Sequence, residues 1–86
     1  MEREYYYVML QVISTSPSSK DLKGKTFICA RFESMEDAER NEIQAVYEFL
    51  DKYNDNHINK ISGEIRMYIG ASTKKLELSD YRGGEM

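Results

Sequence analysis

The sequence predicts an α+β domain of order ββαββ, in which one long helix packs on one face of a four-stranded antiparallel sheet. Residues 5–13 and 25–33 are rich in β-branched and aromatic side chains, as strands are. Apolar residues recur at the helical period in 35–53, and they alternate with polar residues in 61–71 and 75–78. A helix that covers one face of the sheet is the simplest closure of this pattern.

The chain length of 86 residues suits one domain with a thin core. The composition, 41% hydrophobic and 31% charged with a single proline, is that of a globular protein. We therefore assign residues 1–80 to one α+β domain and expect residues 81–86 to form a flexible C-terminal tail. The net charge of −3 gives no general attraction to nucleic acid or to an anionic membrane.

The first two predicted strands each have an apolar face formed by their even-numbered positions. In the first strand this face is continuous and comprises Tyr6, Val8, Leu10 and Val12. In the second strand the matching positions are Thr26, Ile28, Ala30 and Phe32. We expect both sets to face the helix, because successive side chains of a strand point to opposite faces of the sheet.

The segment between these strands, residues 14–24, holds four serines, the only proline and one glycine, and it is predicted to be a loop. It is longer than a usual hairpin connection. Two interpretations remain open, a flexible linker and a mobile binding loop. Leu22 is its only large apolar side chain.

Ser34 is predicted to begin the helix, because Asp37 follows three positions later as in a capping box. The apolar face comprises Met35, Ala38, Ala45, Val46, Phe49, Leu50 and Tyr53. Glu39 and Glu42 interrupt this face. Since unpaired carboxylates are not buried, the first two turns are expected to extend beyond the sheet edge, or the pair to meet cations such as Arg31 or Arg66. The alternative is a functional carboxylate pair, which would be a metal site or an acid/base dyad.

The last two predicted strands also alternate. In residues 61–71 the inward positions are Ile61, Ile65, Met67, Ile69 and Ala71, and Gly63 takes an inward position that could admit the helix or mark a bulge. In residues 75–78, Leu76 and Leu78 are expected to point inward and the charged residues outward.

The face of the sheet away from the helix is predicted to be apolar as well. Its side chains are Tyr5, Tyr7, Met9, Phe27, Cys29 and Tyr68. An apolar patch of that size is unusual on a monomer, so we expect a second copy of the chain to cover it in a homodimer. The alternative is a single-stranded nucleic-acid binder. Its rings would be Tyr5, Tyr7, Phe27 and Tyr68, beside Lys25, Arg31 and Arg66.

The exposed side of the predicted helix is acidic. Residues 33–55 hold eight acidic residues and only two basic ones, Arg40 and Lys52. Such a side is often merely solvated, but it can also recognise a basic surface on a protein partner. The candidate partner-binding residues are Glu36, Asp37, Glu39, Glu42 and Glu48.

Residue patterns with a specific chemistry are absent from the sequence. It has no glycine-rich phosphate loop, no serine elbow and no Cys/His metal cluster, so we expect no cofactor, no metal and no enzymatic activity. The segment 51–62 departs from a calcium loop at Tyr53, Asn56 and Ser62. His57 is expected to be solvated or to cap the helix, and Cys29 to be a packing or interface thiol.

These observations together favour a small non-enzymatic interaction module that binds, and can inhibit, a protein partner with a basic surface. This character is typical of phage and mobile-element accessory proteins. A small-ligand sensor or small enzyme that uses Glu39 and Glu42 is a further alternative. A single cysteine indicates a reducing compartment. We therefore expect a cytoplasmic protein without membrane association.

Overall fold

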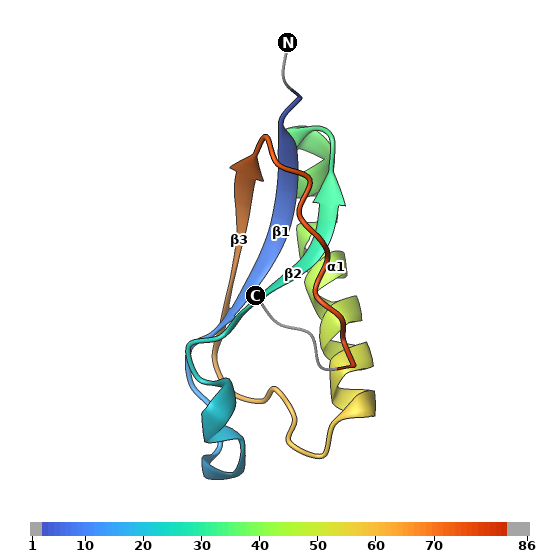
Figure 1. Cartoon of the computed structure of the whole chain (residues 1–86). Coiled ribbons are helices and arrows are strands. Elements are labelled where there is room, and N and C mark those ends of the chain that lie inside the picture. Colours follow the sequence, from blue (N-terminus) through green and yellow to red (C-terminus); the bar gives the residue numbers. More distant parts are fainter. Residues whose placement is uncertain (1–2, 83–86) are drawn as a thin grey trace.

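The structure, a computed structural model, describes residues 3–82 and has one helix packed on one face of a sheet (Figure 1). Its elements in chain order are strand β1 (Tyr5–Val12), the short 3-10 helix η1 (Pro17–Leu22), strand β2 (Thr26–Phe32), helix α1 (Met35–Asn56) and strand β3 (Ile65–Ser72). The sheet order is β2-β1-β3, and both strand pairs are antiparallel. The α+β class, the single helix and the antiparallel sheet are therefore confirmed.

The predicted fourth strand is wrong, because the sheet has three strands within residues 3–82. Residues 74–80, which we call the C-terminal segment, cross the face of the sheet that α1 does not cover (Figure 1). The Tyr7 hydroxyl and the Ile28 backbone in β2 hold this segment by hydrogen bonds, in place of a strand ladder. Two leucines spaced by a charged residue suit an irregular extended segment as well as a strand.

Helix α1 begins as predicted. The Ser34 side chain accepts a hydrogen bond from the Asp37 backbone N–H at 3.1 Å, which satisfies one of the free donors at the helix start. The buried residues of the helix are Ala38, Val46, Phe49 and Tyr53. At the other end, the His57 ring stacks on Tyr53, with 3.8 Å between ring centroids, and its Nδ1 lies 2.9 Å from the Tyr53 carbonyl oxygen. His57 therefore caps the helix.

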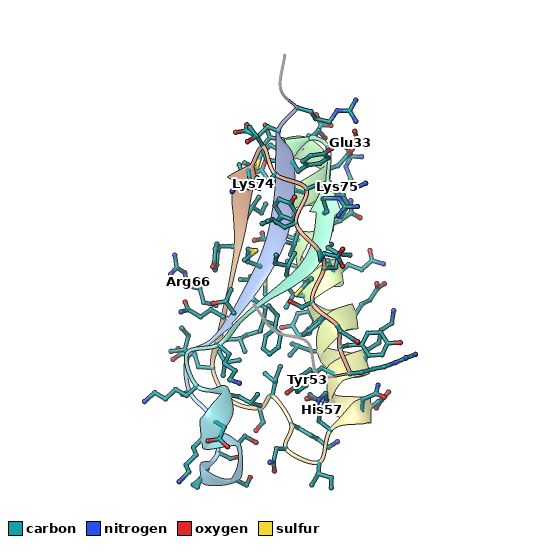
Figure 2. The ribbon with its side chains drawn as sticks, viewed as in Figure 1. Glu33, Tyr53, His57, Arg66, Lys74 and Lys75 are labelled. Carbon is teal, nitrogen blue, oxygen red and sulfur yellow. The ribbon has the colours of Figure 1, made fainter. Side chains whose placement is uncertain are left out.

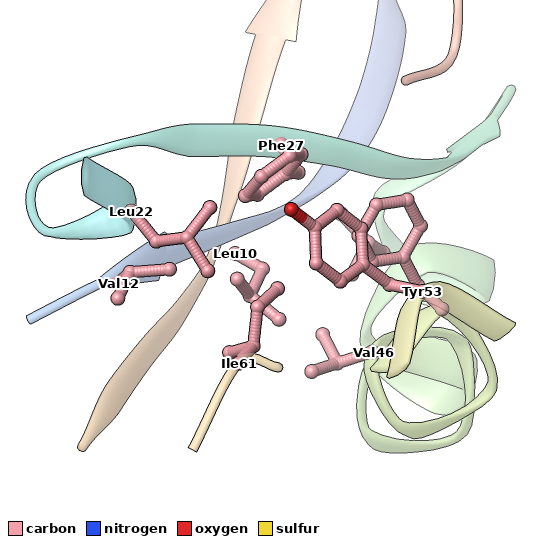
Figure 3. Packing of buried hydrophobic residues seen from close by; sticks show 9 residues of the cluster. Leu10, Val12, Leu22, Phe27, Val46, Tyr53 and Ile61 are labelled. Carbon is pink, nitrogen blue, oxygen red and sulfur yellow. The ribbon is translucent and has the colours of Figure 1, made fainter. Parts of the chain in front are cut away.

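The core lies between α1 and the helix-facing side of the sheet (Figure 3). As predicted, Val8, Leu10 and Val12 of β1 are fully buried in it. Strand β2 departs from the prediction because Val8 lies opposite Ala30 whereas Met9 lies opposite Ile28, which leaves Cys29 as an extra residue. This β-bulge reverses the side-chain alternation.

The bulge places Phe27 in the core and Ile28 on the opposite face, against expectation. The Phe27 ring centroid lies 5.3 Å from that of Phe49 and 5.5 Å from that of Tyr53. Ile28 lies opposite Met9 in the sheet, on the side away from α1, and its N–H donates a hydrogen bond to Ser79 Oγ. Both side chains are nevertheless almost fully buried.

The serine-rich connection between β1 and β2 is ordered around η1. Leu22, at the end of η1, is buried in the core cluster, and so it anchors this loop to the sheet. The Gly24 N–H donates to the Val12 carbonyl, and Gly24 has a positive φ of 86°. Whether the loop binds a partner remains a prediction.

Strand β3 begins later than predicted, at Ile65. Ile65, Met67, Ile69 and Ala71 lie opposite Val12, Leu10, Val8 and Tyr6, so they share the helix-facing side as expected. Gly63 lies in the preceding connection rather than in a strand, with a φ of 107°. Of the predicted tail, Tyr81 packs against the core cluster, and residues 83–86 lie outside the described residues.

Candidate functional site

The outer side of α1 carries a row of exposed acidic residues, which we call the acidic face: Glu36, Asp37, Glu48 and Asp51. Arg40 lies among them and pairs with Glu36 (Nη2 to Oε1, 2.7 Å) and with Asp37 (Nη1 to Oδ1, 3.6 Å). These exposed pairs add little stability. They neutralise the first turns of the helix in part and leave Glu48 and Asp51 as the main negative charges.

Glu39 and Glu42 do not meet the cations expected from the sequence. Glu39 is exposed and Glu42 is half-buried. Arg31 Nη1 instead donates to the Leu76 carbonyl at 3.1 Å, and the Arg66 guanidinium lies 4.9 Å from the centroid of the Tyr68 ring. Within residues 3–82 the structure contains no group of three or more His, Cys, Asp or Glu residues placed to hold a metal ion.

The predicted aromatic face is covered by the chain itself. Tyr7, at its centre, is only 2% exposed. Its hydroxyl donates to the Lys74 carbonyl at 2.5 Å and accepts from the Leu76 N–H at 2.7 Å. The expectation of an uncovered apolar face is therefore wrong for Tyr7. An intramolecular segment excludes water where a second copy had been expected.

The remaining predicted residues of that face are divided between several environments. Phe27 lies in the core. Tyr5, Met9 and Tyr68 are half-buried on the outer side, and Arg31 lies 5.9 Å over the Tyr5 ring. Two of the four rings expected to stack on bases are thus inaccessible, and the predicted stacking platform is not assembled.

Cys29, the extra residue of the bulge, lines a groove between β2, α1 and the C-terminal segment. The groove has a volume of about 420 Å³. Phe32, Ala45 and Phe49 contribute apolar surface. The charged residues that line the groove are Glu48, Lys52 and Asp80. Burial raises the pKa of the Cys29 thiol to about 12. The thiol is therefore protonated at neutral pH, which removes the nucleophilic form.

The groove was missed from the sequence because it depends on the path of the C-terminal segment. The segment reaches the outer edge of β2 at Ser79. There the Ser79 N–H donates to the Ile28 carbonyl at 2.9 Å, and the Ile28 N–H donates to Ser79 Oγ at 2.8 Å. No local pattern in residues 74–80 indicates this pairing, since serine rarely continues a strand ladder with its side chain.

Comparisons of the chain with protein-family models, with curated proteins and with solved structures found no match. No helix in residues 3–82 is both long enough and apolar enough to cross a membrane.

Proposed function

We propose that this chain is a non-enzymatic interaction module that binds a basic surface of a partner protein through the acidic face of α1 and thereby inhibits that partner. The observation that supports this most is the concentration of exposed carboxylates on one side of a rigid, capped helix. A row of like charges on a fixed scaffold steers a basic partner and selects against acidic ones.

The position of the acidic face also supports the proposal. The opposite side of α1 is held by Ala38, Val46, Phe49 and Tyr53 in the core, so the helix cannot rotate its carboxylates away from a partner. Binding would then require little ordering of the backbone, which lowers the entropic cost of association.

The proposal is tested by reversing charge on the acidic face. We expect the double variant Glu48→Lys with Asp51→Lys to lose at least about ten-fold in affinity for the native partner, because both side chains are exposed and neither maintains the core. The partner is first captured from the native host with the wild-type chain. Affinity is then measured with purified components at several salt concentrations.

The matched control is Asp21→Lys with Glu77→Lys, which makes the same change in net charge at exposed positions outside α1. It should retain most of the affinity. Equal losses in the two double variants would show that net charge alone matters. Unchanged binding by the α1 variant would refute the role of the acidic face.

A further inference from the structure

The two edges of the sheet differ in how they are protected. At the β2 edge, Ser79 forms hydrogen bonds with both the N–H and the carbonyl of Ile28. The Arg31 side chain donates a hydrogen bond to the Leu76 carbonyl. The C-terminal segment thus shields the middle of β2. Strand β3 forms the other edge, and in Figure 1 no other element lies beyond it.

The backbone groups that β3 presents at this edge follow from its pairing with β1. The Ile13 N–H donates to the Glu64 carbonyl at 3.0 Å, in the same register as the β1–β3 ladder. Since hydrogen-bonded and non-bonded pairs alternate in an antiparallel ladder, Arg66, Tyr68, Gly70 and Ser72 direct their backbone groups to β1. The groups of Ile65, Met67, Ile69 and Ala71 therefore point outward, and no partner for them is recorded within residues 3–82.

Strand β3 lacks the features that usually prevent edge pairing. It has eight residues and is about 27 Å long at 3.4 Å per residue. It contains no proline or lysine, its register with β1 is unbroken, and Arg66 is its only charge. Figure 2 shows Arg66 on the β3 side of the molecule. A long regular edge of this kind is a template for pairing with another strand.

An exposed apolar flank of α1 lies on the same side of the molecule. Asn41, Ala45 and Glu48 line the groove beside β2, so the opposite flank of the helix lies on the β3 side. That flank carries Ile43, which is 64% exposed, and Tyr47, which is 54% exposed. These are large apolar side chains that the single chain leaves in contact with water.

We propose that β3 pairs with β3 of a second copy, antiparallel about a two-fold axis at Tyr68, so that two three-stranded sheets become one continuous sheet. This register places Met67 opposite Ile69 of the partner copy and Ile65 opposite Ala71. In this symmetric register, every outward N–H and C=O group of β3 pairs with one of the second copy. Because the axis is perpendicular to the sheet, both helices lie on one face, and their Ile43–Tyr47 flanks face each other.

A second copy fits this edge better than a foreign strand, since one antiparallel two-fold pairing satisfies the backbone edge and brings the two apolar helix flanks together. The interface would extend along the roughly 27 Å strand and across the 20 Å depth of the molecule. It would therefore bury roughly 500 Å² of surface on each copy. Stable interfaces bury about 800 Å² per partner. The dimer is therefore reversible and depends on concentration. It goes beyond the proposed function, because a single chain already carries a complete acidic face.

The first experiment measures molar mass by sedimentation from about 10 µM to 1 mM. The wild-type chain should shift from monomer toward dimer over this range. Ile43→Lys, which charges the flank, and Ala71→Pro, which removes an outward N–H, should both weaken the dimer at least about ten-fold. Leu78→Lys is the matched control, because Leu78 is an exposed apolar residue on the β2 side. A monomer at 1 mM, or a dimer unaffected by both variants, overturns the proposal.

The second experiment tests the register by disulfide formation in a Cys29→Ser background. In the proposed dimer, Tyr68 of one copy lies opposite Tyr68 of the other in a pair that is not hydrogen-bonded. The Cα atoms of such a pair lie about 4.5 Å apart, which is within reach of a disulfide. Tyr68→Cys should therefore give a covalent dimer under mild oxidation, whereas Arg66→Cys, opposite Gly70 of the partner copy, should not. Faster cross-linking of Arg66→Cys would refute this register. Circular dichroism of each variant separates a lost dimer from a lost fold.

Discussion

At the scale of single residues, the two glycines with positive φ have different surroundings. A Cβ at Gly63 would lie 2.8 Å from the Ser14 carbonyl oxygen, closer than real Cβ atoms approach. A Cβ at Gly24 would meet nothing within 4 Å. The backbone conformation requires glycine at both positions, but only Gly63 also needs the space.

These two glycines give a matched pair of variants. Gly24→Ala should cost about 1–2 kcal/mol of unfolding free energy, from the positive φ alone. Gly63→Ala should cost at least about 1 kcal/mol more, because the contact is with backbone that cannot move without displacing the start of β3. Urea unfolding of both variants measures the difference. Equal costs would contradict the close approach of Gly63 to the Ser14 carbonyl oxygen.

The half-buried thiol of Cys29 gives a prediction about pH. Its pKa is raised to about 12 in the folded chain, whereas the unfolded chain ionises near the ordinary value. The raised pKa therefore contributes stability that is fully present below pH 9 and is lost as the pH rises toward 12. Cys29→Ala should reduce the decline in unfolding free energy between pH 9 and 11. Identical slopes for the two proteins would contradict the burial of the thiol.

At the scale of elements, the C-terminal segment depends on one hydroxyl. Tyr7→Phe would leave the Lys74 carbonyl and the Leu76 N–H without their partner, at a cost of about 1–3 kcal/mol. Amide hydrogen exchange in residues 74–80 should accelerate while that of β1 changes little. Tyr5→Phe is the control, since no hydrogen bond of the Tyr5 hydroxyl is recorded within residues 3–82. Similar effects of the two variants would contradict this role of Tyr7.

The elements also show which features were accessible from the sequence. The start of α1 was predicted because the Ser34 cap and the apolar period are both local. The orientation of Phe27 was not, because the bulge at Cys29 is set by pairing with β1 and leaves the composition of β2 unchanged. The alternation of Leu76 and Leu78 with charged residues suggested a strand. Such alternation does not show whether another strand lies beside the segment to pair with it. Glu36, Asp37, Glu48 and Asp51 were predicted to be exposed and are exposed. The open β3 edge is visible only in the fold.

At the scale of the whole molecule, the two proposed associations should respond oppositely to salt. Binding of a basic partner relies on attraction between exposed charges, which salt screens. The β3 dimer places two acidic helices on one face, so that screening relieves repulsion between them. From 50 to 500 mM NaCl we expect partner affinity to fall and dimer affinity to rise. Sedimentation and titration at each concentration check both signs, and a dimer weakened by salt would contradict this arrangement of the helices.

The cover over Tyr7 has a consequence for synthesis of the chain. Leu76 follows Tyr7 by 69 residues, yet both belong to one hydrogen-bonded contact. At about 5–20 residues per second, a ribosome completes β1 several seconds before its cover exists. During that interval Tyr7 and Ile28 stay exposed on the nascent chain. Slow translation of the codons for residues 13–76 should therefore prolong chaperone engagement and lower the yield of folded protein.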